Sequence, residues 1–410
     1  MSRSRPLQQQ RTTFLVASGL STAGSFAGLT AKGWILLNGS DNPLLLALHF
    51  AALALPTLLV SGPAGVATDR HGAERVLVLA QWGLFGAGIL GAIAIPLTVG
   101  NLQVGLLLTS TLLVGIASAY ELTARNKYCA LLVEDTNELA PYLTSFSVVF
   151  NVGKLVGPPA GGALVALMGP GAALAIDAAT YLLPIAAVVW LLQPRSGVEV
   201  RSRPGQSASL RRAWSESGPV LRHVLRFCAV ACLASFFHPA MAPLMAREVL
   251  GPSPQSLGIF TSVLAAGSIS GGVLLQRNST WLSQRPALLM GVCTVGTGLA
   301  QLAMAGAGLQ GATWLGLAGT FVIGAGTASL LAGVNLICQV GSAIEIRGRM
   351  AGLGQIAFLG GGGLSGVIAA LIAMRSGLVS SFALLGAVAV ALGSQELLRR
   401  GRLRLELRSD

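Results

Sequence analysis

Long apolar runs repeat along the whole chain, and each has the length needed to cross a lipid bilayer. A helix that spans the roughly 30 Å hydrocarbon core needs about 20 apolar residues. Only 10% of the 410 residues are charged, and the mean hydropathy is +0.71, whereas a soluble domain carries about 25% charged residues. Because a bilayer core offers no water to backbone polar groups, such runs fold as helices. The sequence therefore predicts an all-α membrane protein.

We place twelve spans, each bounded by polar residues or by glycine and proline. Their expected ranges are 14–37, 43–67, 76–99, 101–124, 141–168, 170–192, 220–246, 256–276, 286–308, 312–336, 349–374 and 377–398. The first run follows a basic segment and is too long for the core of a signal peptide. We therefore expect it to be retained as the first transmembrane helix.

The basic residues alternate with these spans. If the N-terminus is cytoplasmic, all but four of the 27 lysines and arginines fall in or beside cytoplasmic segments, the exceptions being Lys32, Lys154, Arg247 and Arg375. Lysine and arginine excess marks cytoplasmic loops. The pattern predicts a multi-pass protein of the plasma membrane, the inner membrane if the source is bacterial, with both termini cytoplasmic. It also explains the net charge of +12 without a nucleic-acid partner.

The longest connection, residues 193–219, is rich in arginine, serine, glycine and proline. It divides the chain into an N-terminal six-helix bundle, residues 1–192, and a C-terminal six-helix bundle, residues 220–410, that ends in a basic cytoplasmic tail. Many secondary transporters have two related halves, with the substrate site near the bilayer midplane. A basic linker of this kind also attracts anionic lipid, so membrane lipid is an expected partner.

A glycine-rich, charged motif lies in the short turn after the second span. It has the pattern G-x-x-x-D-R-x-G-x-x-R and contains Gly65, Asp69, Arg70, Gly72 and Arg75. We expect Gly65 to permit close helix packing, Gly72 to adopt positive φ, and Asp69, with the two arginines, to supply ion-pairing groups at a helix terminus. The motif resembles the loop signature of the major facilitator superfamily, in which this loop acts as a cytoplasmic gate.

Two further features extend this resemblance. Glu121, near the inner end of the fourth span, is expected to form a gate salt bridge with Arg70 or Arg75, although an ordinary interfacial acid is the alternative. After the eighth span, Gln276 and Arg277 follow Gly272 in a weakened second copy of the loop motif. Such a copy is what two diverged halves would leave behind.

The fifth span contains a second small-residue motif, G-x-x-x-G-P-x-x-G-G, formed by Gly153, Gly157, Pro158, Gly161 and Gly162. The glycines favour close helix packing, and the proline weakens the backbone hydrogen-bond ladder. The motif is similar to the fifth-helix motif of exporters in the same superfamily. Residues 151–183 resemble the branch that exports siderophores and macrolides. The resemblance implies alternating access and small-molecule export.

Three ionisable residues are expected inside spans, where a charge costs at least about 2.5 kcal/mol. Asp177 in the sixth span either carries an exchanged proton or pairs with Lys154 in the fifth. Lys154 is too deep for its amine to reach the surface comfortably. Lys32 in the first span either contacts an anionic substrate or extends to the interface beside Trp34.

Two histidines are weaker candidates for substrate binding or proton coupling. His49 and His238 lie in the outer parts of the second and seventh spans, and lone histidines are usually packing residues. Pro239 and Pro243 follow His238 and are expected to interrupt the seventh span.

The sequence favours a secondary active transporter that exports a drug-like or siderophore-like molecule by proton antiport. An importer or uniporter of the same fold remains an alternative, as does a non-transporting receptor. An enzyme is not expected, because the four histidines and five cysteines form no catalytic or metal-ligand set. There is no phosphate-binding loop of an ATPase. We expect no cofactor and no metal, and a monomer with a small-molecule substrate and protons as its partners.

Overall fold

The computed structural model describes residues 7–40, 42–133, 136–192, 210–307, 312–342 and 347–399. Within this part of the chain, twelve helices are long and apolar enough to cross a membrane, and no strand is present. The predicted all-α fold with twelve spans is therefore confirmed. Most predicted boundaries agree within a few residues, and the largest differences are helices that extend beyond the apolar run.

The first six spans are built by eight elements: α1 (Leu7–Gly39), α2 (Pro43–His71), α3 (Ala73–Leu97), α4 (Gly100–Leu131), α5 (Thr136–Met168), α6 (Pro170–Thr180), α7 (Leu182–Ala186) and the π-helical turn η1 (Ala187–Leu191). The last three of these together form the sixth span. A short helix, α8 (Leu210–Glu216), lies in the connection that we expected to be a linker.

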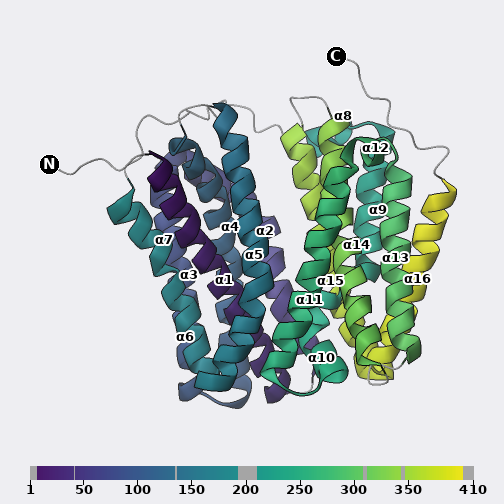
Figure 1. The fold of residues 1–410 in the computed structure, drawn as a ribbon, viewed down its shortest axis with the longest axis horizontal. Coiled ribbons are helices and arrows are strands. Elements are labelled where there is room, and N and C mark those ends of the chain that lie inside the picture. The colour runs from purple at the N-terminus through teal and green to yellow at the C-terminus, as the bar shows by residue number, and fades with distance from the viewer. Residues whose placement is uncertain are drawn as a thin grey trace. The chain divides into compact units, whose positions relative to one another are not determined.

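The remaining spans are built by α9 (Pro219–Ser235), α10 (His238–Leu250), α11 (Pro254–Arg277), α13 (Pro286–Ala307), α14 (Thr313–Val340), α15 (Arg347–Ser376) and α16 (Leu378–Leu398), with α12 (Ser279–Ser283) as a short helix between α11 and α13. The helices α9 and α10 share the seventh span. Figure 1 shows the course of these helices in chain order.

The chain forms two compact units. Unit 1 contains residues 1–41, 52–204 and 253–262, and unit 2 contains residues 42–51, 205–252 and 263–410. In this division each unit exchanges one helix end with the other half of the chain: α2 begins in unit 2 and α11 begins in unit 1. Glycine explains the second exchange, because a β-carbon at Gly258 of α11 would lie 2.8 Å from Cα of Pro159. Only a residue without a side chain allows this approach.

In unit 1, α1 packs beside α5 and α6, and α3 packs beside α4 and α6 (Figure 1). An apolar cluster fills the end of this unit at which α1 begins. The rings of Phe14 and Tyr128 are 5.2 Å apart in an edge-to-face arrangement, and Phe146 packs on Phe14 from α5. This cluster holds α1, α4 and α5 together beneath the charged loop residues.

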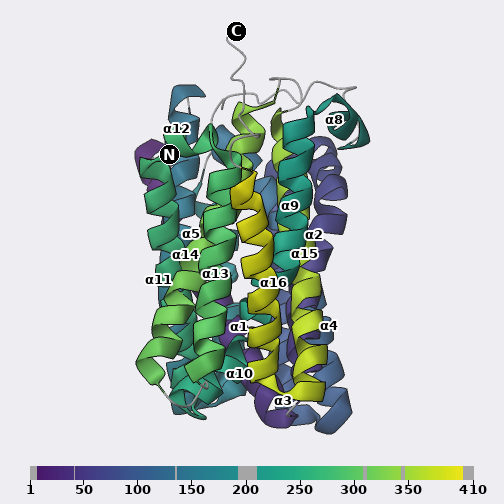
Figure 2. The same ribbon diagram turned by 90° about the vertical axis from the view of Figure 1, so that its right-hand side faces the viewer.

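In unit 2, α16 packs along α13 (Figure 2). Two glycine pairs produce this contact: a β-carbon at Gly298 would lie 2.8 Å from the carbonyl oxygen of Gly386, and one at Gly393 would lie 2.9 Å from that of Gly291. Small residues that face each other let helix backbones approach closely in a membrane. The same residue type therefore organises packing in both units.

Two spans are interrupted next to polar side chains. The sixth span breaks at Tyr181, between α6 and α7, and the seventh breaks at Phe236 and Phe237, directly before His238. The second break confirms the expected interruption of the seventh span, with Pro239 in the first turn of α10. The first break was not expected, but Pro184 in α7 explains it, because proline removes the hydrogen bond to the carbonyl oxygen four residues earlier, that of Thr180.

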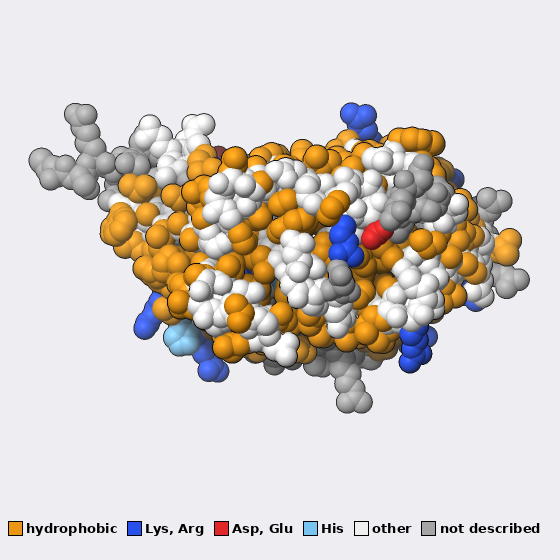
Figure 3. Space-filling model, turned by 90° about the horizontal axis from the view of Figure 1, so that it is seen from below, with side chains coloured by type: hydrophobic (Ala, Val, Ile, Leu, Met, Phe, Trp, Pro, Cys, Tyr) orange, Lys and Arg blue, Asp and Glu red, His pale blue; other side chains and the backbone are white. Residues whose placement is uncertain are grey.

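Charged side chains are sparse on one face of the molecule. Figure 3 views the end at which α5 joins α6, and hydrophobic and uncharged atoms cover most of it. The alternation of basic residues predicts that this end lies outside the cell.

Candidate functional site

Asp177 and Lys32 lie together in the interior of unit 1. The Asp177 side chain, on α6, is 5% exposed, and Lys32, on α1, is 4% exposed. The two groups interact electrostatically, so the buried carboxylate has a buried ammonium as its counter-charge. Buried charges of opposite sign stabilise each other in a medium of low polarity. This pair is the charged centre of the candidate site.

Lys32 is held by the neighbouring helices. Its Nζ donates a hydrogen bond of 2.7 Å to Oγ of Ser110 on α4, and Ser110 Oγ donates to the carbonyl oxygen of Ala87 on α3 at 2.6 Å. Gly91 on α3 leaves room for the lysine, because a β-carbon there would lie 3.3 Å from Cε of Lys32. The alternative that Lys32 extends to the interface is therefore wrong: Ser110 and Asp177 satisfy its charge inside the bundle.

Asp177 is only partly satisfied. Its carboxylate accepts a hydrogen bond from the hydroxyl of Tyr181, one turn further along the chain. Its Oδ1 atom has no hydrogen-bond partner among the residues that the structure describes. A buried oxygen without a donor is costly and is uncommon in stable proteins. The carboxylate thus has a free position for a proton.

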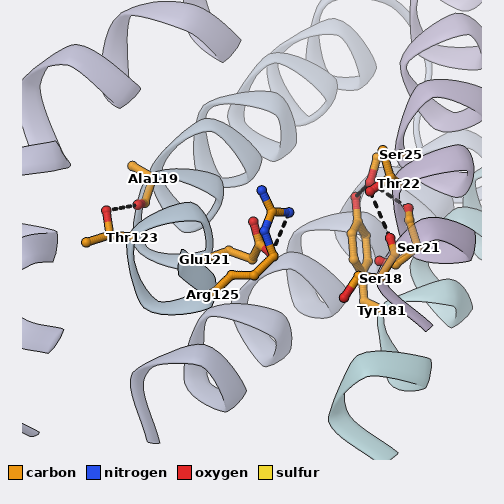
Figure 4. Close-up of polar contacts among 9 residues, drawn as sticks. All are labelled: Ser18, Ser21, Thr22, Ser25, Ala119, Glu121, Thr123, Arg125 and Tyr181. Carbon is orange, nitrogen blue, oxygen red and sulfur yellow. Dashed lines mark hydrogen bonds and ion pairs between the residues drawn. The ribbon is translucent and has the colours of Figure 1, made fainter. Parts of the chain in front are cut away.

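A hydroxyl pair continues from Asp177 toward α1. Oγ of Ser25 lies 2.9 Å from the hydroxyl oxygen of Tyr181. Figure 4 shows these two groups facing each other, beside Ser18, Ser21 and Thr22 of α1. Sequence reasoning missed Tyr181 because an aromatic residue in an apolar run is expected to pack in the core. Its spacing of four residues from Asp177 could have identified it, since such residues share a helix face.

Glycines on α1 make this arrangement possible. Gly28 faces the Asp177 carboxylate so closely that a β-carbon would overlap it, and Gly24 faces Thr180 in the same way. The two helices therefore approach closely at the level of Asp177.

Lys154 is not part of this centre. It lies half-buried on α5, and the cation beside Asp177 is Lys32 rather than Lys154. The alternative pairing of Asp177 with Lys154 was therefore wrong. Sequence spacing could not reveal this, because the choice depends on which face of α1 packs against α6.

The glycine-rich loop after α2 has part of the expected geometry. Gly72 has φ of 85° and caps the start of α3, as predicted for a tight turn. Asp69 forms an ion pair with Nζ of Lys127 on α4 at 2.5 Å, so the loop is tied to the fourth span. Gly65 was expected to allow close helix packing, but no atom of the described residues lies within 4 Å of its β-carbon position, so that expectation is wrong.

Glu121 does not pair with the loop arginines. Nη1 of Arg125, one turn along α4, donates to Oε1 of Glu121 at 3.1 Å (Figure 4). Arg70 and Arg75 have exposed side chains, whereas Glu121 and Arg125 are mostly buried. The predicted gate salt bridge is therefore replaced by a pair within one helix, because residues four apart already face each other.

The fifth-helix motif packs α5 against two neighbours. Gly153, Gly157 and Gly161 lie along one face and touch the backbone of α1, and a β-carbon at Gly157 would lie 2.6 Å from the carbonyl oxygen of Ala23. Gly162 faces the start of α11, where its β-carbon would lie 2.5 Å from the carbonyl oxygen of Pro254. Pro158 contacts the same segment of α11. The prediction that these residues allow close packing is confirmed.

His238 forms a separate polar group in unit 2. Its Nε2 lies 3.0 Å from Nε2 of Gln301 on α13, and its ring packs against Phe237 and Phe382. The atoms His238 Nδ1 and Gln301 Oε1 have no hydrogen-bond partner in the described part of the chain. His49 is also buried and lies in the segment of α2 that belongs to unit 2. Both histidines belong to unit 2, whereas Asp177 and Lys32 belong to unit 1.

A hydrogen bond between His223 and the buried Glu396 was also missed. Glu396 on α16 is 1% exposed, and its Oε1 lies 2.9 Å from Nε2 of His223 on α9. We expected Asp177 to be the one acid well inside a span, but the end of α16 is covered by its neighbours. The two partners lie 173 residues apart, so no local pattern could connect them.

A groove of about 720 Å³ lies between α2, α3 and α4. Its lining is mostly apolar and includes Trp82, Gly83 and Leu113, and Arg75 of the loop motif lies at its edge. Neither Asp177 nor Lys32 lines it, so it is distinct from the charged centre.

The chain matches a family described as transmembrane secretion effector over residues 1–406. It is 25% identical over 399 residues to the multidrug efflux pump Tap of Mycolicibacterium fortuitum, a match that covers 92% of this chain and 95% of that protein. The Tap pump of Mycobacterium tuberculosis strain H37Rv is 26% identical over 211 residues, covering 49% of this chain and 50% of that protein.

Solved structures show the same fold. A mutant of the nucleoside transporter NupG has a TM-score of 0.77 at 12% identity, covering 95% of this chain and 99% of its own. A bacterial homologue of the human lysosomal transporter Spinster has a TM-score of 0.72 at 16% identity and covers 98% of both chains. At such identities the likeness concerns the fold alone.

Proposed function

Because the chain belongs to the transmembrane secretion effector family of the major facilitator superfamily, and so is a transporter and not an enzyme, we propose that it exports a small molecule in exchange for protons. Alternating access is the mechanism expected of this fold. The export direction and a drug-like or siderophore-like substrate are supported by the similarity to the Tap efflux pump. Proton exchange is supported by the chemistry of unit 1.

The observation that carries the proposal is the burial of Asp177 beside Lys32, with one carboxylate oxygen lacking a donor. An ionisable group inside a span is costly and is usually functional. A carboxylate can bind and release one proton, and Oδ1 is free to receive it. Asp177 is therefore our candidate for the residue that carries the exchanged proton.

Because of Lys32, protonation of Asp177 changes the net charge of a buried pair of side chains. When Asp177 is ionised, the two charges cancel. When Asp177 is protonated, Lys32 becomes an uncompensated buried cation, which costs about 2.5 kcal/mol or more. That energy favours either rearrangement of the helices around Lys32 or binding of an anionic group of the substrate. Protonation and a change of state are thus linked through one pair of side chains.

The loop and fifth-helix motifs supply the moving parts in this proposal. The Asp69–Lys127 ion pair is partly exposed and can break at little cost, since such pairs contribute about 0–1 kcal/mol. The glycine face of α5 lies directly on the backbone of α1 at Ala23 and Ala27. We propose that the ion pair opens and that α5 slides along α1 during transport.

The proposal is tested by measuring accumulation of erythromycin, tetracycline and a catecholate siderophore in cells with and without the protein. An exporter lowers the accumulation of at least one compound, and a protonophore removes the difference if protons drive export. Higher accumulation in the presence of the protein would indicate an importer and contradict the direction proposed. A difference that survives the protonophore would contradict proton exchange.

A further inference from the structure

Ser25, Tyr181 and Asp177 form a continuous chain of oxygen atoms within unit 1. Ser25 Oγ and the Tyr181 hydroxyl lie 2.9 Å apart, and the Tyr181 hydroxyl is hydrogen-bonded to the Asp177 carboxylate. Exposure decreases along this chain: Ser25 is partly exposed, whereas Tyr181 and Asp177 are buried. Of the three residues, Ser25 has the most exposed side chain.

The hydroxyls of Ser25 and Tyr181 have hydrogen-bond acceptors whether Asp177 is ionised or protonated. With Asp177 ionised, Ser25 donates to Tyr181 and Tyr181 donates to the carboxylate. With Asp177 protonated, both bonds reverse, and the Ser25 hydroxyl needs another acceptor. The carbonyl oxygen of Ser21 provides it, at 2.9 Å from Ser25 Oγ. A hydroxyl both donates and accepts, so the reversal requires no movement of a heavy atom.

We infer that Ser25 and Tyr181 conduct the exchanged proton to and from Asp177; this inference rests on the proposed proton exchange. A hydronium ion gives a proton to Ser25 Oγ, Ser25 passes its own proton to the Tyr181 oxygen, and Tyr181 passes its proton to the carboxylate. The hydronium ion becomes water, and the carboxylate becomes a carboxylic acid. Each hydroxyl keeps one proton throughout, and release follows the same steps in reverse.

The position of Tyr181 in the fold suits this role. It lies at the break between α6 and α7. There its backbone N–H donates to the carbonyl oxygen of Ala178, three residues earlier, whereas a regular α-helix bonds residues four apart. The charged groups that act on the chain are Lys32, beside Asp177, and Glu121, which acts on Tyr181 through space. Both are held by other partners, Ser110 and Arg125, so they shape the local field without joining the chain.

The test uses the full chain in lipid nanodiscs and follows the carboxylic acid infrared band after a rapid drop in pH. The band that is missing in Asp177→Asn belongs to Asp177. We expect Tyr181→Phe and Ser25→Ala to slow its appearance about tenfold or more, because each removes a proton-transfer group. Ser25→Thr keeps the hydroxyl and should keep the rate.

Thr30→Val is the matched control, since it removes a buried α1 hydroxyl that donates to the Phe26 carbonyl oxygen of its own helix. Its rate should equal that of the unaltered protein. An unaltered rate in Tyr181→Phe, or equal slowing in Thr30→Val, would overturn the relay. If Tyr181→Phe does not fold, the comparison of Ser25→Ala with Ser25→Thr decides. If Asp177 shows no pH-dependent band at all, the proposed function fails instead of the relay.

Discussion

Gly28 of α1 lies directly against the carboxylate of Asp177 on α6, with no room for a β-carbon between them. The distance between these helices, and with it the position of the buried carboxylate next to Lys32, depends on this one missing side chain. The same relationship predicts what happens when the space is filled.

Gly28→Ala should destabilise the protein and impair coupling. The added methyl group must displace the carboxylate or separate α1 from α6, and overpacking of this kind costs about 1–3 kcal/mol. Thermal unfolding of the purified protein measures the loss. Gly86→Ala is the control, because within the part of the chain that the structure describes no atom lies within 4 Å of the β-carbon position at Gly86. Equal stability of the two variants would show that the Gly28 contact is unimportant.

Gly157→Ala should slow transport more than it lowers stability. Its β-carbon would press on the Ala23 carbonyl at 2.6 Å and so obstruct movement of α5 along α1. Initial rates of efflux from cells measure the effect, and Gly105→Ala, at a position with open space, is the control. Full transport activity in Gly157→Ala would argue against a moving contact at this face.

Asp69→Ala and Lys127→Ala should reduce turnover to a similar extent while changing stability by no more than about 1 kcal/mol, because a partly exposed ion pair contributes little to folding. If the pair acts as one unit, the double variant should be no slower than either single variant. Turnover measured in a double-mutant cycle checks this. Additive losses would mean that the two residues act independently.

The orientation can be checked with cysteine labelling in intact cells. A membrane-impermeant thiol reagent should not label Gln206→Cys, in the connection predicted to be cytoplasmic, but should label Asn101→Cys, at the start of α4. Four of the five native cysteines are buried, which keeps the background low. Strong labelling of Gln206→Cys from outside would reverse the predicted topology.

The spans could be predicted from the sequence because apolar run length depends on the bilayer and not on tertiary contacts. The role of Gly72 was also predictable, since positive φ in a tight turn is a local property. The partner of Asp177 was not predictable. It depends on the face that α1 presents to α6, which Gly28 and Gly24 determine through contacts with residues about 150 positions away.

Long-range partners account for the other differences. Glu121 is closest to Arg125 because a helix brings residues four apart together, whereas the loop arginines are exposed. Glu396 at the end of α16 has the sequence context of an interfacial acid, and only its contact with His223 of α9 shows that it is a buried partner.

The most direct test of the account is proton-driven transport by Asp177→Asn. The purified full chain is reconstituted into proteoliposomes, and uptake of a substrate identified in the cell assay is driven by an imposed pH gradient. Asparagine keeps the shape of the side chain but cannot exchange a proton. We predict that substrate binding persists while gradient-driven accumulation is lost. Accumulation equal to that of the unaltered protein would contradict the assignment of Asp177 as the proton carrier.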